Sequence, residues 1–196
     1  MKNKAFTLAE TLIVLCLIGV LATMMITSFN KSTPDKRKLL FKKAYSVAES
    51  VVGELVNDES LYPFDPDRIG FKNTDKVTLE GTTEEYGGSK NSTAAKQKFP
   101  KLFERKLNVV ESNVSSTIAG AKYTWFTASN GISYSFNGNF VDSNQVEILV
   151  DIDGLGNGGN TIGQDILRIL VNFDGKVSVP SSPEKEMLES DASTNG

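Results

Sequence analysis

The residues with the clearest potential for chemistry are oxygen-bearing side chains in a glycine-rich stretch, residues 151–165. They are Asp151, Asp153, Asn157, Asn160 and Asp165. Calcium takes six to eight oxygen ligands in flexible geometry, and carboxylates, amide oxygens and backbone carbonyls supply them. The spacing therefore makes this stretch a candidate calcium site.

A second interpretation of the same stretch needs no ligand. Asn and Gly tolerate positive φ, so the stretch can equally be a connection between two strands. It does not match the EF-hand loop, because Gly154 stands where that pattern requires an oxygen side chain. A phosphate-binding loop is excluded because no Gly-Lys-Ser or Gly-Lys-Thr follows. Both interpretations of residues 151–165 stay open: a calcium site, and a connection between strands that binds no ligand.

The rest of the composition argues against catalysis. The chain of 196 residues has no histidine and a single cysteine, Cys16. Histidine triads, histidine general bases and histidine metal ligands are therefore excluded, and no disulfide can form within the chain. The net charge of −3 gives no support to nucleic-acid binding. We expect no enzymatic activity and no nucleic-acid partner.

Four aromatic residues lie in two β-rich segments and allow two interpretations. Trp125, Phe126, Tyr134 and Phe136 could form an exposed face that binds sugar or DNA. Aromatic residues at strand spacing belong more often to the core. We therefore expect these four residues in the core.

The N-terminal part of the chain carries a long uncharged stretch. No residue from Thr11 to Phe29 is charged, and roughly 20 apolar residues are needed to cross a bilayer. A membrane-spanning helix is the prediction. The stretch is too long for a secretory signal peptide. A lipoprotein signal at Cys16 is disfavoured because bulky Leu15 precedes it and the apolar run continues beyond it.

The residues around this stretch resemble the signature of type IV pilins and type II secretion pseudopilins. A short basic leader, residues 1–5, is followed by Phe6-Thr7-Leu8 and by Glu10, the fifth residue after Ala5. The family usually has glycine where this chain has Ala5. The resemblance covers about the first thirty residues. It implies cleavage by prepilin peptidase between Ala5 and Phe6, followed by methylation of Phe6.

Glu10 is the predicted assembly residue. A carboxylate near the end of a membrane helix costs up to about 3 kcal/mol unless it finds a partner. The resemblance implies that this partner is the new amine on Phe6 of a neighbouring subunit. It also implies co-assembly with like or related subunits and contact with membrane lipid. Some pseudopilins hold calcium in a C-terminal loop, which adds to the interest of residues 151–165.

The resemblance and the charge pattern disagree on orientation. Basic residues are more frequent after the predicted span than before it, which would place the C-terminal side in the cytoplasm. The resemblance instead places the leader inside and the body in the periplasm or outside, with a single pass through the inner membrane. A different class of protein also fits: an anchored envelope protein that never polymerises and whose domain binds a ligand.

The predicted fold is α+β and pilin-like, with a long N-terminal helix packed on a C-terminal antiparallel sheet. Apolar residues at helical spacing continue the helix from Lys36 to Asn57, and a further helix is expected within Thr93–Leu107, starting near Lys98 because of Pro100. Four or five strands are expected, with a two-residue turn at Asn130-Gly131. The predicted parts are a leader (1–5), a membrane and assembly helix (6–30), an amphipathic half-helix (31–58), a globular domain (59–180) and a disordered tail (181–196).

Overall fold

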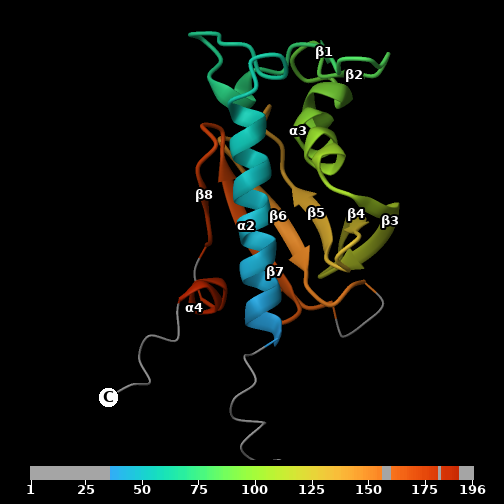
Figure 1. The fold of residues 1–196 in the computed structure, drawn as a ribbon, viewed down its shortest axis with the longest axis vertical. Helices are drawn as coiled ribbons and strands as arrows, with labels where there is room; N and C mark the ends of the chain where they lie inside the picture. The colour runs from blue at the N-terminus through green and yellow to red at the C-terminus, as the bar shows by residue number, and fades with distance from the viewer. Residues whose placement is uncertain (1–35, 156–159, 181, 190–196) are drawn as a thin grey trace, which may run out of the picture. The chain divides into compact units, whose positions relative to one another are not determined.

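The dominant element of the computed structural model is a six-stranded antiparallel sheet (Figure 1). The structure describes residues 36–155, 160–180 and 182–189. Each strand pairs with its sequence neighbours, in the order β3-β4-β5-β6-β7-β8, so the sheet is a meander without crossovers. The strands are β3 (Val109–Ile118), β4 (Ala121–Ala128), β5 (Ser133–Asn137), β6 (Gln145–Asp151), β7 (Ile166–Asn172) and β8 (Val177–Ser178).

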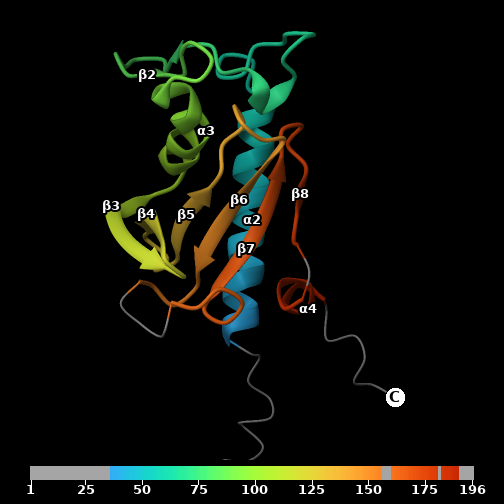
Figure 2. The same ribbon diagram turned by 180° about the vertical axis from the view of Figure 1, so that it is seen from behind.

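Helix α2 (Lys36–Val56) covers one face of this sheet (Figures 1 and 2). Its buried residues recur every three or four positions and so lie on one side of the helix. They are Phe41, Ala44, Ala48, Val51, Val52 and Leu55. Leu39 lies outside this side of the helix, since it is 57% exposed whereas Phe41 is 0% exposed.

The two faces of the sheet carry different cores because side chains alternate along each strand. Val150 and Leu167 belong to the large core under α2. Trp125, Leu149 and Ile166 belong to a smaller apolar cluster. Both sets are buried, so the strands in the middle of the sheet have apolar side chains on both faces.

The segment after α2 holds four short elements. They are the 3-10 helix η1 (Gly70–Lys72), the strands β1 (Val77–Thr78) and β2 (Glu85–Tyr86), and helix α3 (Thr93–Lys106). Strands β1 and β2 lie beyond the C-terminal end of α2, and α3 lies beside that helix (Figure 1). Phe71 anchors this segment, with its ring centroid 4.7 Å from that of Phe99 in α3 and 5.0 Å from that of Phe140.

Helix α3 begins earlier than the sequence predicted. Its first residue is Thr93, because the Ser92 hydroxyl accepts a hydrogen bond from the Ala95 N–H at 3.0 Å and caps the helix. Pro100 lies inside the helix, where a start or bend near Lys98 was expected.

The turn at Asn130-Gly131 is also longer than predicted. The Ala128 N–H donates to Ile132 O at 3.0 Å, which leaves three residues in the loop, and Gly131 has φ +82°. A three-residue hairpin loop commonly ends in such a left-handed residue. The two-residue turn occurs instead at Ala119-Gly120, where both residues have positive φ and Ile118 pairs with Ala121.

The segment after Pro180 contains a helix where the sequence predicted disorder. Helix α4 (Glu184–Leu188) places Glu184 at 0% exposure, and the Arg168 Nε donates to Glu184 Oε1 at 2.9 Å. Met187 and Leu188 also pack against the main core. One ion pair and two apolar contacts therefore hold α4, although its composition is polar.

The predicted fold class is wrong. The described part of the chain is mostly sheet and has three α-helices, of which the first begins at Lys36 and none is long and apolar. The described chain contains more sheet than the sequence predicted. Strand β3 was not predicted, because its residues between Val109 and Ile118 are largely polar and exposed. Within the described ranges, no helix combines the length and apolarity that a bilayer crossing requires. The predicted span, 6–30, lies outside these ranges.

Candidate functional site

The structure brings two of the predicted calcium ligands to the same corner of the sheet. Asp151 is the last residue of β6, where it pairs with Ile166 of β7 on one side and with Ser133 of β5 on the other. Asp165 comes directly before β7, and its carbonyl oxygen accepts a hydrogen bond from the Ile152 N–H at 3.4 Å. The stretch between them is thus a connection of antiparallel neighbours, and its two ends place these two aspartates close together.

Backbone N–H groups satisfy one oxygen of each aspartate. Asp151 Oδ1 accepts from the N–H groups of Gly154 at 2.9 Å and Asp153 at 3.3 Å. Asp165 Oδ1 accepts from the Thr161 N–H at 3.3 Å. These bonds fix the side chains at the start and end of the connection.

The remaining oxygens of this corner are buried and lack a hydrogen bond. Asp151 Oδ2, Asp165 Oδ2 and Asn160 Oδ1 have no hydrogen-bond partner among the described residues, although Asp151 is 0% exposed and Asp165 is 9% exposed. A buried polar oxygen without a partner is costly. Two such carboxylate oxygens and one amide oxygen within fifteen residues are an arrangement that a cation would stabilise.

Electrostatics at Asp151 point the same way. Burial, followed by the neighbouring Asp153 carboxyl group, raises the pKa of Asp151 to about 7. The described residues alone do not complete a metal site, since no three Asp, Glu, His or Cys side chains of theirs converge on one point. Asn157 lies outside the described residues. Of the five predicted ligands, Asp153 lies beside Asp151, and Asp165 is joined to the end of β6 by the backbone hydrogen bond from Ile152.

The predicted processing and assembly residues are at the N-terminus. Ala5, Phe6 and Glu10 all lie outside the described residues. Their roles stay predictions.

The four aromatic residues of the β-rich segments form core, as expected. Trp125 and Tyr134 are 0% exposed, Phe126 is 5% exposed and Phe136 is half-buried. Phe126 and Tyr134 stack with ring centroids 5.6 Å apart. They do not form an exposed face for sugar or DNA.

Lys98 is a functional candidate that sequence reasoning missed. The residue is 2% exposed, and its Nζ donates to the carbonyl oxygens of Asn73 at 3.1 Å and Asp75 at 3.0 Å. The same nitrogen lies 4.3 Å from the centroid of the Tyr62 ring, a cation–π contact. These contacts tie α3 to the segment after α2. The only sequence signal for the burial of Lys98 is its position in a predicted helix, next to the apolar residue Phe99.

A groove of about 560 Å³ lies between α3 and the sheet. Lys101 and Lys122 lie on its walls beside Tyr123 and Phe136. A second hollow, of about 250 Å³, lies at the C-terminal end of α2.

Comparisons of the chain with protein-family models, with curated proteins and with solved structures found no match.

Proposed function

We propose that the chain is a structural subunit, of pilin or pseudopilin type, of a filament that assembles from the inner membrane. The observation that carries the proposal is the sequence Phe6-Thr7-Leu8 with Glu10, placed directly ahead of the uncharged stretch Thr11 to Phe29. An acid at that position is unfavourable in a lone membrane helix. A neighbouring subunit with a free N-terminal amine removes the cost.

The described domain supports a surface-presenting role. Most of its apolar side chains belong to two cores, and the aromatic residues of the sheet are buried or half-buried rather than arranged as a ligand site. The domain follows the N-terminal segment directly, because α2 starts at Lys36. In this proposal the N-terminal segment assembles and the domain coats the filament.

The N-terminus of the mature protein tests this function. Mass spectrometry of the purified full chain should show Phe6 as the first residue, with its amine methylated. Glu10→Ala and Glu10→Val should leave this processing unchanged and should prevent incorporation into filaments, because each removes the anion that pairs with the amine. Glu49→Ala, a loss of the same charge on exposed α2 surface, is the control.

An intact Met1 would support the alternative of an anchored envelope protein that does not polymerise. Normal incorporation of Glu10→Ala would remove the pairing role of Glu10 and leave the processing itself standing.

A second function, calcium binding at the β6–β7 connection, is favoured by one specific observation. Three buried oxygens there, on Asp151, Asn160 and Asp165, have no hydrogen-bond partner among the described residues. Calcium would add positive charge at this corner and would be held by carboxylate, amide and carbonyl oxygens. In this proposal the ion fixes the connection between β6 and β7.

Thermal unfolding with and without calcium tests the second function. Calcium at about 100 times its Kd should raise the Tm of the full chain by about 5–10 °C, because it binds only the folded state. Asp151→Asn and Asp165→Asn should abolish this shift, whereas Asp67→Asn, at an exposed position outside the connection, should keep it. An unchanged Tm in the wild type would contradict calcium binding.

A further inference from the structure

One end of the domain carries an acidic hollow with an apolar rim, here called the tip pocket. Its volume is about 250 Å³, and the carboxylates of Glu59, Asp65 and Asp174 line it together with Tyr62, Phe64 and Ile69. Phe64 is 82% exposed and Ile69 is 56% exposed. Asp65 forms an ion pair with Arg68 at 2.7 Å, so the unpaired negative charge comes from Glu59 and Asp174, which form no ion pair with a described residue. The pocket therefore suits a segment that is both cationic and apolar.

The opposite end of α2 carries a segment of that kind, here called the base segment, residues 37–43. It contains four cations and no acid, and Leu39 at its middle is 57% exposed. The cluster of cations favours an anionic partner at this end. Lys42 and Lys43 form no ion pair with any described residue.

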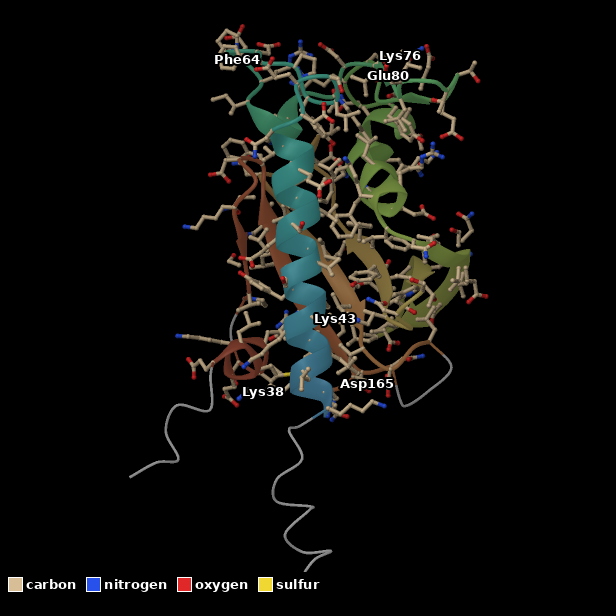
Figure 3. All side chains as sticks on the ribbon, viewed as in Figure 1. Lys38, Lys43, Phe64, Lys76, Glu80 and Asp165 are labelled. Atoms are coloured by element: carbon tan, nitrogen blue, oxygen red, sulfur yellow. The ribbon has the colours of Figure 1, made fainter. Side chains whose placement is uncertain are left out.

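The two surfaces lie too far apart to meet within one molecule. Leu39 and Val56, which also lines the tip pocket, are 17 residues apart on α2, so about 25 Å separates them. Figure 3 shows Lys38 and Lys43 at one end of the helix and Phe64 at the other. Asp165 is labelled at the same end as the lysines and is buried.

We propose that the base segment of one copy docks in the tip pocket of the next copy along the filament. Leu39 inserts beside Phe64 and Ile69, and Lys42 and Lys43 approach the carboxylates of Glu59 and Asp174. Different surfaces meet in this contact, so it is heterologous and propagates into an open assembly. The inference rests on the proposed filament function and names the contact by which the domains stack.

Cysteine cross-linking of the full chain tests the contact directly. In a Cys16→Ser background, one tagged copy carries Leu39→Cys and a second, differently tagged copy carries Phe64→Cys. Oxidation of filament-bearing membranes should link the two tags. A single chain that carries both substitutions should give a ladder of multimers on a non-reducing gel, because each copy then links to two neighbours.

Charge reversal provides an independent arm. Lys42→Glu with Lys43→Glu should reduce the cross-link by about tenfold or more, because like charges then face each other. Glu59→Lys with Asp174→Lys in the second copy should restore it. Lys101→Glu with Lys122→Glu makes the same change of charge in the groove beside α3 and should leave the cross-link unchanged.

Two outcomes overturn the inference. Cross-links only from position 39 to position 39, or from 64 to 64, would show that base segments or tip pockets of different copies pack against their own kind. No link between positions 39 and 64 would mean that the base segment faces another surface, such as anionic lipid headgroups, and loss of membrane binding on Lys42→Glu with Lys43→Glu would identify that surface. Neither outcome bears on Phe6 processing, so the proposed function is judged separately.

Discussion

Lys98 is the only buried cation among the described residues, and its environment makes stability depend on pH. Burial lowers the pKa of Lys98 to about 8, against the opposing attraction of Asp75, with Arg68 acting in the same direction as burial. The unfolded chain, with an ordinary lysine pKa, binds more protons above pH 8, so the free energy of unfolding rises with pH. We expect a gain of up to about 3 kcal/mol between pH 8 and 10.5, complete only near the upper limit.

Urea unfolding of the full chain in detergent between pH 7 and 9.5 measures this effect. Lys98→Met should flatten the profile, whereas Lys101→Met, at an exposed position of the same helix, should not. The scan ends below pH 10 because Tyr62 adds an opposite effect there. Burial raises the pKa of Tyr62, so above pH 10 the tyrosine ionises in the unfolded chain but not in the folded one, and stability falls. A wild-type profile that is flat from pH 7 to 9.5 would contradict the assigned shift.

Removal of Arg168 and removal of Glu184 should reduce stability by different amounts, although the two residues form one ion pair. Glu184 is 0% exposed at its side chain and Arg168 is 29% exposed, and Arg168 also has Glu147 at 3.8 Å. Arg168→Leu leaves a buried carboxylate alone and should cost about 3 kcal/mol in chemical denaturation. Glu184→Leu leaves a cation with another partner and water, so it should cost less. Equal losses in the two variants would show that Glu184 is not buried in solution.

At the scale of elements, α2 should be anchored by Phe41 and not by Leu39. Phe41 belongs to the main core and Leu39 is exposed, although both lie in one apolar run. Phe41→Ala should lower the free energy of unfolding by about 3–5 kcal/mol, because it leaves a cavity between helix and sheet. Leu39→Ala should change it by less than about 0.5 kcal/mol. Denaturant titration of both variants measures these changes. A large loss of stability in Leu39→Ala would show that Leu39, and not Phe41, faces the core.

The elements that the sequence predicted are those whose burial pattern is regular. Strands β6 and β7 were predicted because most of their residues are apolar, and β4 and β5 because aromatic residues recur at strand spacing. Strand β3 was missed because it lies at the edge of the sheet, where exposed side chains impose no apolar pattern. Helix α4 was missed because the residue that holds Glu184 in place, Arg168, lies in a different element, strand β7.

The candidate calcium corner was predicted in composition but not in arrangement. Glycines and oxygen side chains identified residues 151–165 as a connection with ligand potential. Only the pairing of β6 with β7 shows that Asp151 and Asp165 meet, because register is a property of the folded sheet. The tip pocket could not be predicted at all, since Phe64 and Asp174 come together only through the fold.

At the scale of the whole molecule, the tip pocket depends on one close backbone contact. The Phe71 N–H donates to Phe173 O at 2.9 Å, and a Cβ on Gly70 would lie 2.3 Å from that same oxygen. Gly70 also has φ +56°, which costs other residues about 1–2 kcal/mol. Gly70→Ala should therefore detach the pocket wall from the turn that follows β7.

This coupling separates stability from assembly. Gly70→Ala should lower the free energy of unfolding by at least about 1–2 kcal/mol and should also abolish the link between positions 39 and 64. Gly53→Ala, in α2 with nothing within 4 Å of the added Cβ, should raise stability by about 0.5–1 kcal/mol and leave the link intact. A destabilising substitution outside both docking surfaces, Ile148→Ala in β6, distinguishes the two effects, because it weakens the core without changing the base segment or the pocket wall. If Gly70→Ala kept the link while Ile148→Ala lost it, docking would follow overall stability rather than the shape of the tip pocket.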